Sequence, residues 1–339
     1  MPSIPTGVVR QAAAQAQPNI ALVKYWGKRD VALNLPVVGS LSITLDSIWT
    51  RTLVCFEPAL AQDTFILNGV ANAAAGARAS TSLDVLRARA GITTRARIET
   101  RNNFPTGAGL ASSASGFAAL VTAAAAALGL ELDARERSVL ARRGSGSAAR
   151  SIFGGYAEWH RGTRDDGTDS CAEPLLAASA WPLRVVVAVT SEAQKSVSST
   201  DGMLRTARTS PYERAWESTQ EADLAEARAA IHAHDFAKLA AVSEASCLKM
   251  HALAMAARPG LLYWNAATMA GLHCVRQLRA EGVPVFFTVD AGPQLKAVCL
   301  PEAAEKVAAA LCELPGVLRI VECGLGAGAR VIPMETVAA

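Results

Sequence analysis

Residues 102–115 read NNFPTGAGLASSAS, and an apolar, alanine-rich segment follows directly at residues 116–128. Glycines let the backbone turn tightly, so that several N–H groups can point at one place. Serines are good N-caps, and the first N–H groups of a helix lack intrahelical partners and favour an anion. The segment therefore predicts a phosphate-binding loop at the start of a helix, although a capped loop without a ligand would have the same local composition.

Two common phosphate loops are excluded at this position. A Walker loop ends in Gly-Lys followed by Ser or Thr, and this segment contains no lysine. A dinucleotide fingerprint needs a third glycine where Ser112 stands. Instead, Pro105 together with the Gly-Leu-x-Ser-Ser-Ala motif at residues 109–114 resembles the phosphate loop of the GHMP kinase superfamily.

The bulk composition excludes several classes of protein. The chain has 339 residues, 51% of them hydrophobic, and a net charge of +3 with no basic block, so we expect two domains and no nucleic-acid partner. The longest apolar run, residues 117–128, is too short to span a bilayer, and the first 17 residues lack the apolar core of a secretory leader. Seven scattered cysteines without a C-x-x-C pair indicate reduced thiols, and we expect a cytoplasmic protein.

The hydrophobic pattern predicts an α+β protein that divides near residue 180, into domains at residues 1–180 and 181–339. In the first part we expect strands at residues 41–45, 50–56, 95–100 and 154–159, and helices at residues 82–90, 116–128 and 133–143, the last capped by Asp133. In the second part we expect strands at residues 183–189, 283–289, 297–300, 317–323 and 330–333, and helical sequence at residues 211–257, 261–281 and 301–314.

Four further segments carry groups that suit a phosphorylated substrate. They are NIALVKYWGKRD at residues 19–30, GSGSAARS at 144–151, KSVSSTDGM at 195–203 and DAGP at 290–293. Lysine supplies a point charge, arginine a planar fork for a carboxylate or phosphate, and aspartate a group that can orient or deprotonate a hydroxyl. Taken singly, each also fits an ordinary edge strand, linker, capped turn or hairpin turn.

All five segments occur together, in this order, in the mevalonate diphosphate decarboxylases, and the chain resembles that family over nearly its whole length. Residues 33–36 (LNLP) and the pair Thr209-Ser210 match as well. The resemblance implies a two-domain GHMP kinase fold, with an N-terminal ribosomal-S5-like α/β domain and a C-terminal ferredoxin-like α+β domain. The active site is then expected in the cleft between them.

The resemblance also implies a reaction. The family decarboxylates (R)-5-diphosphomevalonate to isopentenyl diphosphate, with ADP, phosphate and carbon dioxide as the other products, by phosphorylating the C3 hydroxyl. ATP and Mg²⁺ are the implied cofactors, and a homodimer is the implied assembly. The sequence shows no carboxylate cage, so we expect no protein metal ligands and an ion held mostly by ATP and water.

Residue roles follow from matched positions. Asp290 matches the aspartate beside the C3 hydroxyl, as base or orienter; Arg150 matches the arginine that holds the substrate carboxylate; Lys24 matches the lysine near the transferred phosphoryl group. The residues expected around the rest of the substrate are Tyr25, Lys28, Ser145, Ser147, Ser198 and Ser199. Those expected around the nucleotide are Asn103, Pro105, Gly107, Ala108, Gly109, Leu110, Ser112 and Ser113.

Three positions depart from the family pattern: Val38 and Gln294 replace asparagines, and Ala149 stands where Cys or Ser is common. We expect the first two to alter how the substrate tail or the nucleotide is held. Two other enzymes remain alternatives, a decarboxylase of 5-phosphomevalonate and a kinase that only phosphorylates the C3 hydroxyl. A catalytically silent nucleotide-binding protein is a third alternative, and the presence of Asp290, Arg150 and Lys24 argues against it.

Overall fold

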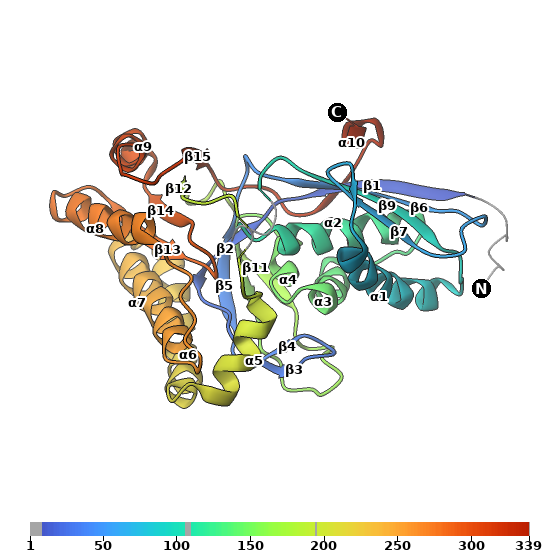
Figure 1. Cartoon of the computed structure of the whole chain (residues 1–339), viewed down its shortest axis with the longest axis horizontal. Coiled ribbons are helices and arrows are strands. Elements are labelled where there is room, and N and C mark those ends of the chain that lie inside the picture. Colours follow the sequence, from blue (N-terminus) through green and yellow to red (C-terminus); the bar gives the residue numbers. More distant parts are fainter. Residues whose placement is uncertain (1–8, 106–109, 194, 339) are drawn as a thin grey trace.

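A computed structural model describes residues 9–105, 110–193 and 195–338 of the chain. Two groups of helices flank a central set of strands, with α1 to α4 on one side and α6 to α9 on the other (Figure 1). The arrangement confirms the α+β class predicted from the sequence.

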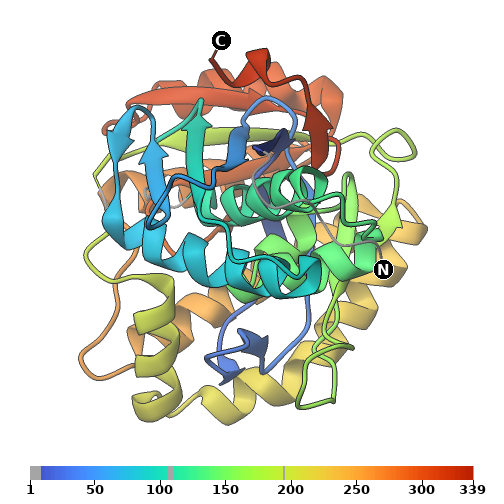
Figure 2. The same cartoon turned by 90° about the vertical axis from the view of Figure 1, so that its right-hand side faces the viewer.

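The first sheet has the strand order β16-β1-β6-β9-β7-β8. Its strands are β1 (Arg10–Ala16), β6 (Thr50–Phe56), β7 (Thr64–Leu67), β8 (Val70–Ala71), β9 (Ala96–Asn102) and β16 (Arg330–Ile332). Helices α1 (Ala73–Ala90) and α2 (Ser112–Ala127) pack beneath it (Figure 2). Nine of the sixteen residues of α2 are alanine or glycine, so the helix lies close to the strands above it.

The second sheet has the strand order β11-β10-β5-β2, which places the start of the segment at residues 19–30 on its edge strand. Its strands are β2 (Asn19–Val23), β5 (Ser40–Thr44), β10 (Tyr156–Trp159) and β11 (Ala172–Leu176). Helices α3 (Ala134–Gly144) and α4 (Ala148–Ser151) belong to the same half of the chain as this sheet. Strand β3 (Lys28–Asp30) pairs with β4 (Leu35–Pro36) in a separate two-stranded ribbon.

The third sheet is antiparallel, in the order β13-β14-β12-β15. Its strands are β12 (Arg184–Val189), β13 (Val285–Val289), β14 (Leu295–Cys299) and β15 (Arg319–Cys323). Alternate residues belong to two cores: Val185 and Val187 face the second sheet, whereas Val186 and Ala188 face helices α8 (Ala266–Ala280) and α9 (Ala304–Cys312). The sheet is therefore buried on both faces, which explains its dense β-branched sequence.

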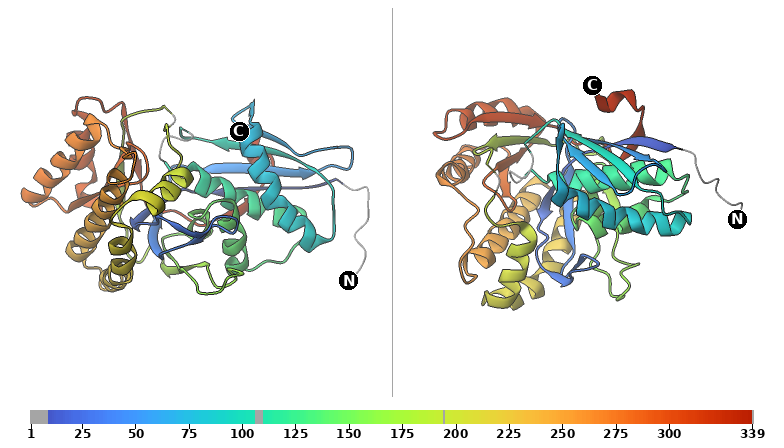
Figure 3. Two further views of the ribbon diagram at one scale, coloured as in Figure 1. Left: turned by 60° about the horizontal axis from the view of Figure 1, so that its bottom comes forward. Right: turned by 45° about the vertical axis from the view of Figure 1, so that its right-hand side comes forward.

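The helices of the second half are α5 (Ser199–Thr209), α6 (Glu213–His232), α7 (Phe236–Met255), α8 (Ala266–Ala280) and α9 (Ala304–Cys312), with a 3₁₀ turn η1 (Pro301–Ala303) and a short α10 (Glu335–Ala338). Helix α5 and the β3–β4 ribbon lie at the junction of the two halves (Figure 3). The predicted boundary near residue 180 stays a prediction, and β16 returns to pair with β1 in the first sheet.

Several predicted elements need correction. The helical sequence at 211–257 is two helices, because the chain turns at His234, which has a φ of 53°, and Asp235 caps the second helix. The helix expected from residue 261 begins only at Ala266, after the cap Asn265, and the helix expected from residue 82 begins at Ala73. Strand β1 was not predicted, because its sequence RQAAAQA has no β-branched residue.

The serines before α2 do not cap it as expected. Ala111 occupies the N-cap position with a φ of 54°, and its side chain provides no hydrogen bond to the helix. The helix already begins at Ser112, four residues earlier than predicted. Ser112 and Ser113 thus lie in its first turn rather than at its N-cap.

Candidate active site

A cavity of about 760 Å³ opens between the two halves of the chain, and side chains from both halves line it. Of the fourteen described residues with predicted roles, eleven border this cavity: Lys24, Tyr25, Lys28, Ser112, Ser113, Ser145, Ser147, Arg150, Ser198, Ser199 and Asp290. The structure thus brings together residues from five separate sequence segments. Their roles toward a ligand remain predictions.

Lys24 follows the last residue of β2 and is buried. Its Nζ donates to Asp290 Oδ1 at 2.6 Å, and its backbone N–H donates to Ser246 Oγ on α7 at 2.9 Å. Its carbonyl accepts a hydrogen bond from Gln220 of α6 at 2.7 Å. Lys24 therefore has little freedom at its backbone, and its charge is presented at the cavity wall.

Asp290 follows β13 and carries an ion pair on each carboxylate oxygen. Lys24 binds Oδ1, and Lys296 of β14 lies 3.3 Å from Oδ2. Burial by itself raises the pKa of Asp290, but the two lysines outweigh it and hold that pKa below the usual range of a carboxyl group. The side chain is therefore a carboxylate at neutral pH, suited to accept a hydrogen bond and to stabilise nearby positive charge.

Arg150 lies in α4 and is almost fully buried. Its Nε donates to Asn19 Oδ1 at 3.1 Å and to Ser42 Oγ at 2.9 Å, and its Nη1 donates to Ser40 Oγ. Burial lowers the pKa of Arg150 to about 10, so the guanidinium stays charged at neutral pH. Strands β2 and β5 thus fix one side of the guanidinium.

Tyr25 and Lys28 form the next part of the wall. Within the part of the chain that the structure describes, the Tyr25 hydroxyl has no hydrogen-bond partner, and burial raises its pKa above the usual value. The ring packs on Trp159 at 4.7 Å and lies against Gly146, where an added Cβ would come within 2.7 Å of the hydroxyl. Lys28 Nζ donates to Asn34 Oδ1 at 2.5 Å and to Thr200 Oγ1 at 3.2 Å.

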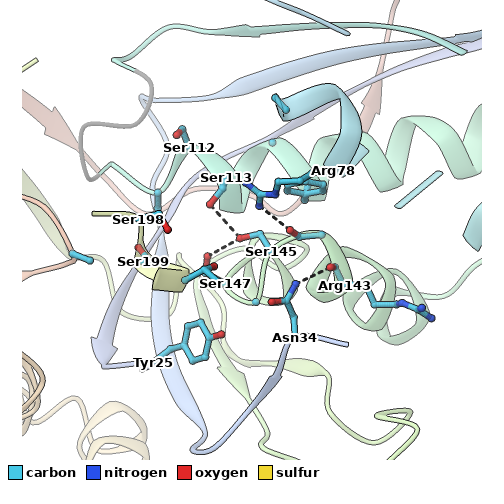
Figure 4. Close-up of a pocket in the computed structure, with 18 of the residues that line it drawn as sticks. Tyr25, Asn34, Arg78, Ser112, Ser113, Arg143, Ser145, Ser147, Ser198 and Ser199 are labelled. Atoms are coloured by element: carbon cyan, nitrogen blue, oxygen red, sulfur yellow. Dashed lines mark hydrogen bonds between the residues drawn. The ribbon is translucent and has the colours of Figure 1, made fainter. Parts of the chain in front are cut away.

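A row of hydroxyl groups crosses the cavity. Ser145 Oγ lies 3.2 Å from Ser113 Oγ and 3.5 Å from Ser147 Oγ, which links the start of α2 with the loop after α3 (Figure 4). On the opposite side, Ser198 caps α5 through the Asp201 N–H, and Ser199 Oγ accepts a hydrogen bond from Lys195 Nζ at 2.7 Å. Such hydroxyls can both donate to and accept from a phosphate.

The predicted nucleotide residues are only partly visible. Gly107, Ala108 and Gly109 lie outside the described residues. Asn103 binds the backbone of Ser47 and Trp49, and Leu110 is buried in the core between the sheets. Neither these two residues nor Pro105 borders the described cavity, so their contact with a nucleotide stays a prediction.

The sequence analysis missed several residues of the site. Arg78 of α1 borders the cavity, donates to the Gly144 carbonyl at 2.9 Å and lies over the Phe117 ring (Figure 4). Asn34 joins Lys28 to the Arg143 carbonyl, and Lys296 pairs with Asp290. Nothing in the alanine-rich sequence of α1 marks Arg78 as a site residue. Lys296, in contrast, is a single lysine in the apolar strand LKAVC, and a buried charge of this kind usually has a partner.

The three departures lie away from the cavity wall. Val38 is buried in a cluster with Trp26 and Trp216, and Ala149 packs against Trp159. Gln294 Oε1 accepts from the Thr190 N–H at 2.7 Å, and its amide nitrogen donates to the Ser191 carbonyl at 2.5 Å. Gln294 therefore joins the end of β12 to the turn that carries Asp290.

Among the described residues, no group of three or more His, Cys, Asp or Glu side chains could hold a metal ion. The acidic group nearest the centre of the site, Asp290, is already paired with two lysines. This donor set suits an ion that arrives coordinated by nucleotide phosphates better than a resident protein-bound metal. Within the same residues, no helix is long and apolar enough to cross a membrane.

Comparison with known protein families decides the assignment. Residues 16–172 match the diphosphomevalonate decarboxylase-like N-terminal domain, and residues 185–321 match the mevalonate 5-diphosphate decarboxylase C-terminal domain. The chain belongs to the diphosphomevalonate decarboxylase family. The diphosphomevalonate decarboxylase of Gibberella zeae is 40% identical over 305 residues, which cover 84% of this chain and 80% of the relative. That of Saccharomyces cerevisiae is 38% identical and covers 91% of this chain and 82% of the relative.

Solved structures of the diphosphomevalonate decarboxylase family superimpose closely on this one. The mevalonate diphosphate decarboxylase of Staphylococcus aureus gives a TM-score of 0.90 at 38% identity, covering 96% of this chain and 99% of that one. A structure described as MDDEF in complex with MVAPP, AMPPCP and magnesium gives a TM-score of 0.89 at 39% identity, covering 96% of this chain and 100% of that one. The two-domain GHMP kinase fold expected from the sequence is therefore confirmed.

Proposed function

We propose that this protein catalyses the ATP-dependent decarboxylation of (R)-5-diphosphomevalonate to isopentenyl diphosphate, ADP, phosphate and carbon dioxide. The observation that carries the proposal is the meeting of Asp290, Lys24 and Arg150 at one cavity wall. A carboxylate, a lysine and an arginine are the groups that this reaction needs beside a hydroxyl, a transferred phosphoryl group and a leaving carboxylate. Relatives at 36–40% identity that bear this enzyme name support it.

The substrate has two anionic ends, and the cavity offers a cationic group for each. We assign the carboxylate to Arg150, because Asn19, Ser40 and Ser42 orient its guanidinium. We assign the diphosphate to Lys28, to the Tyr25 hydroxyl, which has no hydrogen-bond partner among the described residues, and to the hydroxyls of Ser145, Ser147, Ser198 and Ser199. Substrate oriented in this way has its C3 hydroxyl near Asp290.

The nucleotide is assigned to the wall formed by α1 and the start of α2. Ser112 and Ser113 lie in the first turn of α2, where the helix dipole favours phosphate. An apolar surface formed by Phe65, Leu67, Ala79, Phe117 and Leu120 borders the same cavity and suits an adenine ring. The predicted contacts of Asn103, Pro105, Leu110 and the glycines of the loop belong to this part of the proposal.

ATP with its magnesium ion supplies the phosphoryl group that makes the C3 oxygen a leaving group. The Asp290 carboxylate accepts the hydrogen bond of the C3 hydroxyl and passes its proton to a phosphate oxygen as the phosphoryl group is transferred, so that Asp290 is a carboxylate again. Its low pKa makes it a weak base, so orientation and charge stabilisation are its main contributions. Lys24 balances the charge of the transferred group.

Phosphate departure leaves positive charge at C3, and the Asp290 carboxylate stabilises it electrostatically. Arg150 holds the substrate carboxylate until the C1–C2 bond breaks. The electrons of that bond form the C2=C3 double bond, and carbon dioxide leaves. Because Arg150 and Asp290 act on opposite ends of this rearrangement, both side chains are required for the second stage.

The proposal is tested by ADP release with three acceptors in parallel: 5-diphosphomevalonate, 5-phosphomevalonate and mevalonate. We expect kcat/KM to be highest with the diphosphate, because Lys28, Tyr25 and the serines offer more hydrogen-bond donors than a single phosphate group can use. A preference for 5-phosphomevalonate or for mevalonate would overturn the substrate assignment. Absence of ADP with all three acceptors, despite nucleotide binding, would favour the silent protein.

The proposal includes a cytoplasmic location and a homodimer. All seven cysteines are free thiols, five of them buried, which fits a reducing compartment. The dimer rests on the resemblance to the family. Sedimentation of the purified protein distinguishes a dimer from a monomer of 35.3 kDa.

A further inference from the structure

Lys296 is a fully buried lysine with no role in the reaction described above. It lies in β14, between Val187 of β12 and Thr288 of β13 in the strand register. Val187, Phe286 and Val298 place apolar side chains in the core on this side of the sheet. Burying an ammonium group in such surroundings is strongly unfavourable unless a counter-charge compensates for it.

The counter-charge is the carboxylate of Asp290. Lys296 Nζ lies 3.3 Å from Oδ2, while Lys24 Nζ lies 2.6 Å from Oδ1, so that each oxygen has its own lysine. The two lysines differ in access to ligands. Lys24 and Asp290 border the cavity, whereas Lys296 lies behind the carboxylate and has no exposed surface.

This difference in access suggests that the two lysines have different roles. A phosphoryl group entering the cavity attracts Lys24, which is the lysine it can reach. If Lys24 turned toward it without a second cation nearby, Asp290 would be a buried, poorly compensated carboxylate and would tend to take up a proton. The charged and titratable groups that surround Asp290 are Lys24, Arg150, Lys195, Cys247, His251 and Lys296.

We infer that Lys296 is a positioning residue, which holds the Asp290 carboxylate in place from behind so that Lys24 can serve the transferred phosphoryl group. The inference rests on the proposed role of Asp290 and adds to it a residue that never touches substrate. The turn between Asp290 and Lys296 is held in place as well, because Gln294 forms hydrogen bonds with the backbone of Thr190 and Ser191 at the end of β12.

The first test is Lys296→Met, which keeps the length of the side chain and removes its charge. We expect kcat to fall on the order of tenfold or more with little change in KM, because Lys296 does not contact the ligands. We also expect the acidic limb of the kcat profile to move to higher pH by about one unit or more, as the Asp290 carboxylate loses a cation. Thr288→Val is the matched control, a fully buried polar residue opposite Lys296 whose hydroxyl donates to the Ala21 carbonyl.

A lower kcat with an unmoved pH profile, or a change confined to KM, would overturn the inference. So would equal effects of Lys296→Met and Thr288→Val, because a role in packing alone predicts them. Each of these outcomes is read from steady-state rates over a range of pH.

The second test measures stability and not activity. Its result therefore tests the pairing of Lys296 with Asp290 even if the proposed reaction is wrong. Thermal unfolding is measured for Asp290→Asn, Lys296→Met and the double variant. If Lys296 acts through the carboxylate, the double variant unfolds at a higher temperature than the sum of the two single shifts predicts. Additive shifts would contradict the inference. If Lys296→Met alone fails to fold, a folded double variant supports the inference and an unfolded one overturns it.

Discussion

Lys24 Nζ lies 2.6 Å from Asp290 Oδ1, although the two residues are 266 positions apart in the chain. One follows a strand of the second sheet and the other a strand of the third, so the ion pair joins the two halves at the cavity wall. The site therefore exists only when the halves are packed together, and the same contact contributes both to stability and to the proposed chemistry.

Replacing Asp290 with asparagine keeps the shape of this contact and removes its charge. We expect kcat to fall by several orders of magnitude, because a group that acts in the transition state is lost. We also expect a lower temperature of unfolding, since Lys24 and Lys296 are left buried without a counter-charge, at a cost of about 3–5 kcal/mol. Asp166→Asn, on an exposed loop, controls for the loss of a carboxylate. Turnover near that of the unaltered protein would refute the role of Asp290.

The Tyr25 hydroxyl has no partner among the described residues, which makes it a sensitive probe of ligand binding. We expect Tyr25→Phe to raise KM for the diphosphate about tenfold, the loss of roughly one hydrogen bond to a charged group, while the unfolding temperature stays the same. Tyr156→Phe is the matched control: its hydroxyl donates to the Trp181 carbonyl at 2.8 Å, so stability falls and KM does not change. The reverse pattern would show that the Tyr25 hydroxyl is structural.

The orientation of Arg150 depends on Ser42, whose Oγ accepts from Nε at 2.9 Å. We expect Ser42→Ala to lower kcat/KM about 10- to 100-fold, because a hydrogen bond to a charged group contributes about 1.5–3 kcal/mol. Ser243→Ala is the control, since the Ser243 hydroxyl is equally buried and has no hydrogen-bond partner among the described residues. Equal kinetics for the two variants would argue against a role of Ser42 in holding Arg150.

Binding of the anionic substrate should weaken at alkaline pH. Burial lowers the pKa of Lys28 to about 8, with Arg78 lowering it further and Asp201 opposing the change. The ammonium is charged below this pKa and neutral above it, so kcat/KM falls as the pH rises through about 8. Lys195, whose pKa burial also lowers to about 8, contributes to the same decline.

Lys28→Met separates the two lysines in this pH range. The variant should bind the diphosphate more weakly at pH 7 and show a shallower alkaline decline, which Lys195 alone causes. If kcat/KM of the variant falls with rising pH as steeply as that of the unaltered protein, the pH dependence belongs to groups other than Lys28. The measurement is kcat/KM between pH 6 and 10 at constant ionic strength.

Local signals in the sequence were sufficient for some elements. Asp133 and Glu136 form a capping box at the start of α3, and the two partners are only three positions apart in the sequence. The alternating segment TRTLVCF is strand β6 over its predicted length. In contrast, the start of α8 was misplaced because its capping box, Asn265 with Thr268, was overlooked in favour of the apolar residues before it.

Some residues of the candidate site could likewise be predicted from the sequence, and others could not. Residues in recognisable motifs, such as Lys24, Arg150 and Asp290, were found from the sequence, and the structure places them together. Arg78 and Lys296 belong to no motif. Arg78 meets the Gly144 carbonyl, which lies 66 positions further along the chain, and Lys296 faces Asp290 because β14 returns beside β13. The sequence of the alanine-rich α1 gives no sign of the contact that Arg78 makes.

The central claim is that phosphoryl transfer and decarboxylation occur in one site, and a stoichiometry tests it most directly. The purified protein is incubated with ATP, Mg²⁺ and 5-diphosphomevalonate, and ADP and carbon dioxide are measured in the same sample over time. We predict equal amounts of the two products at every time, with both lost in Asp290→Asn. ADP without carbon dioxide would contradict the account and identify the protein as a kinase of the C3 hydroxyl.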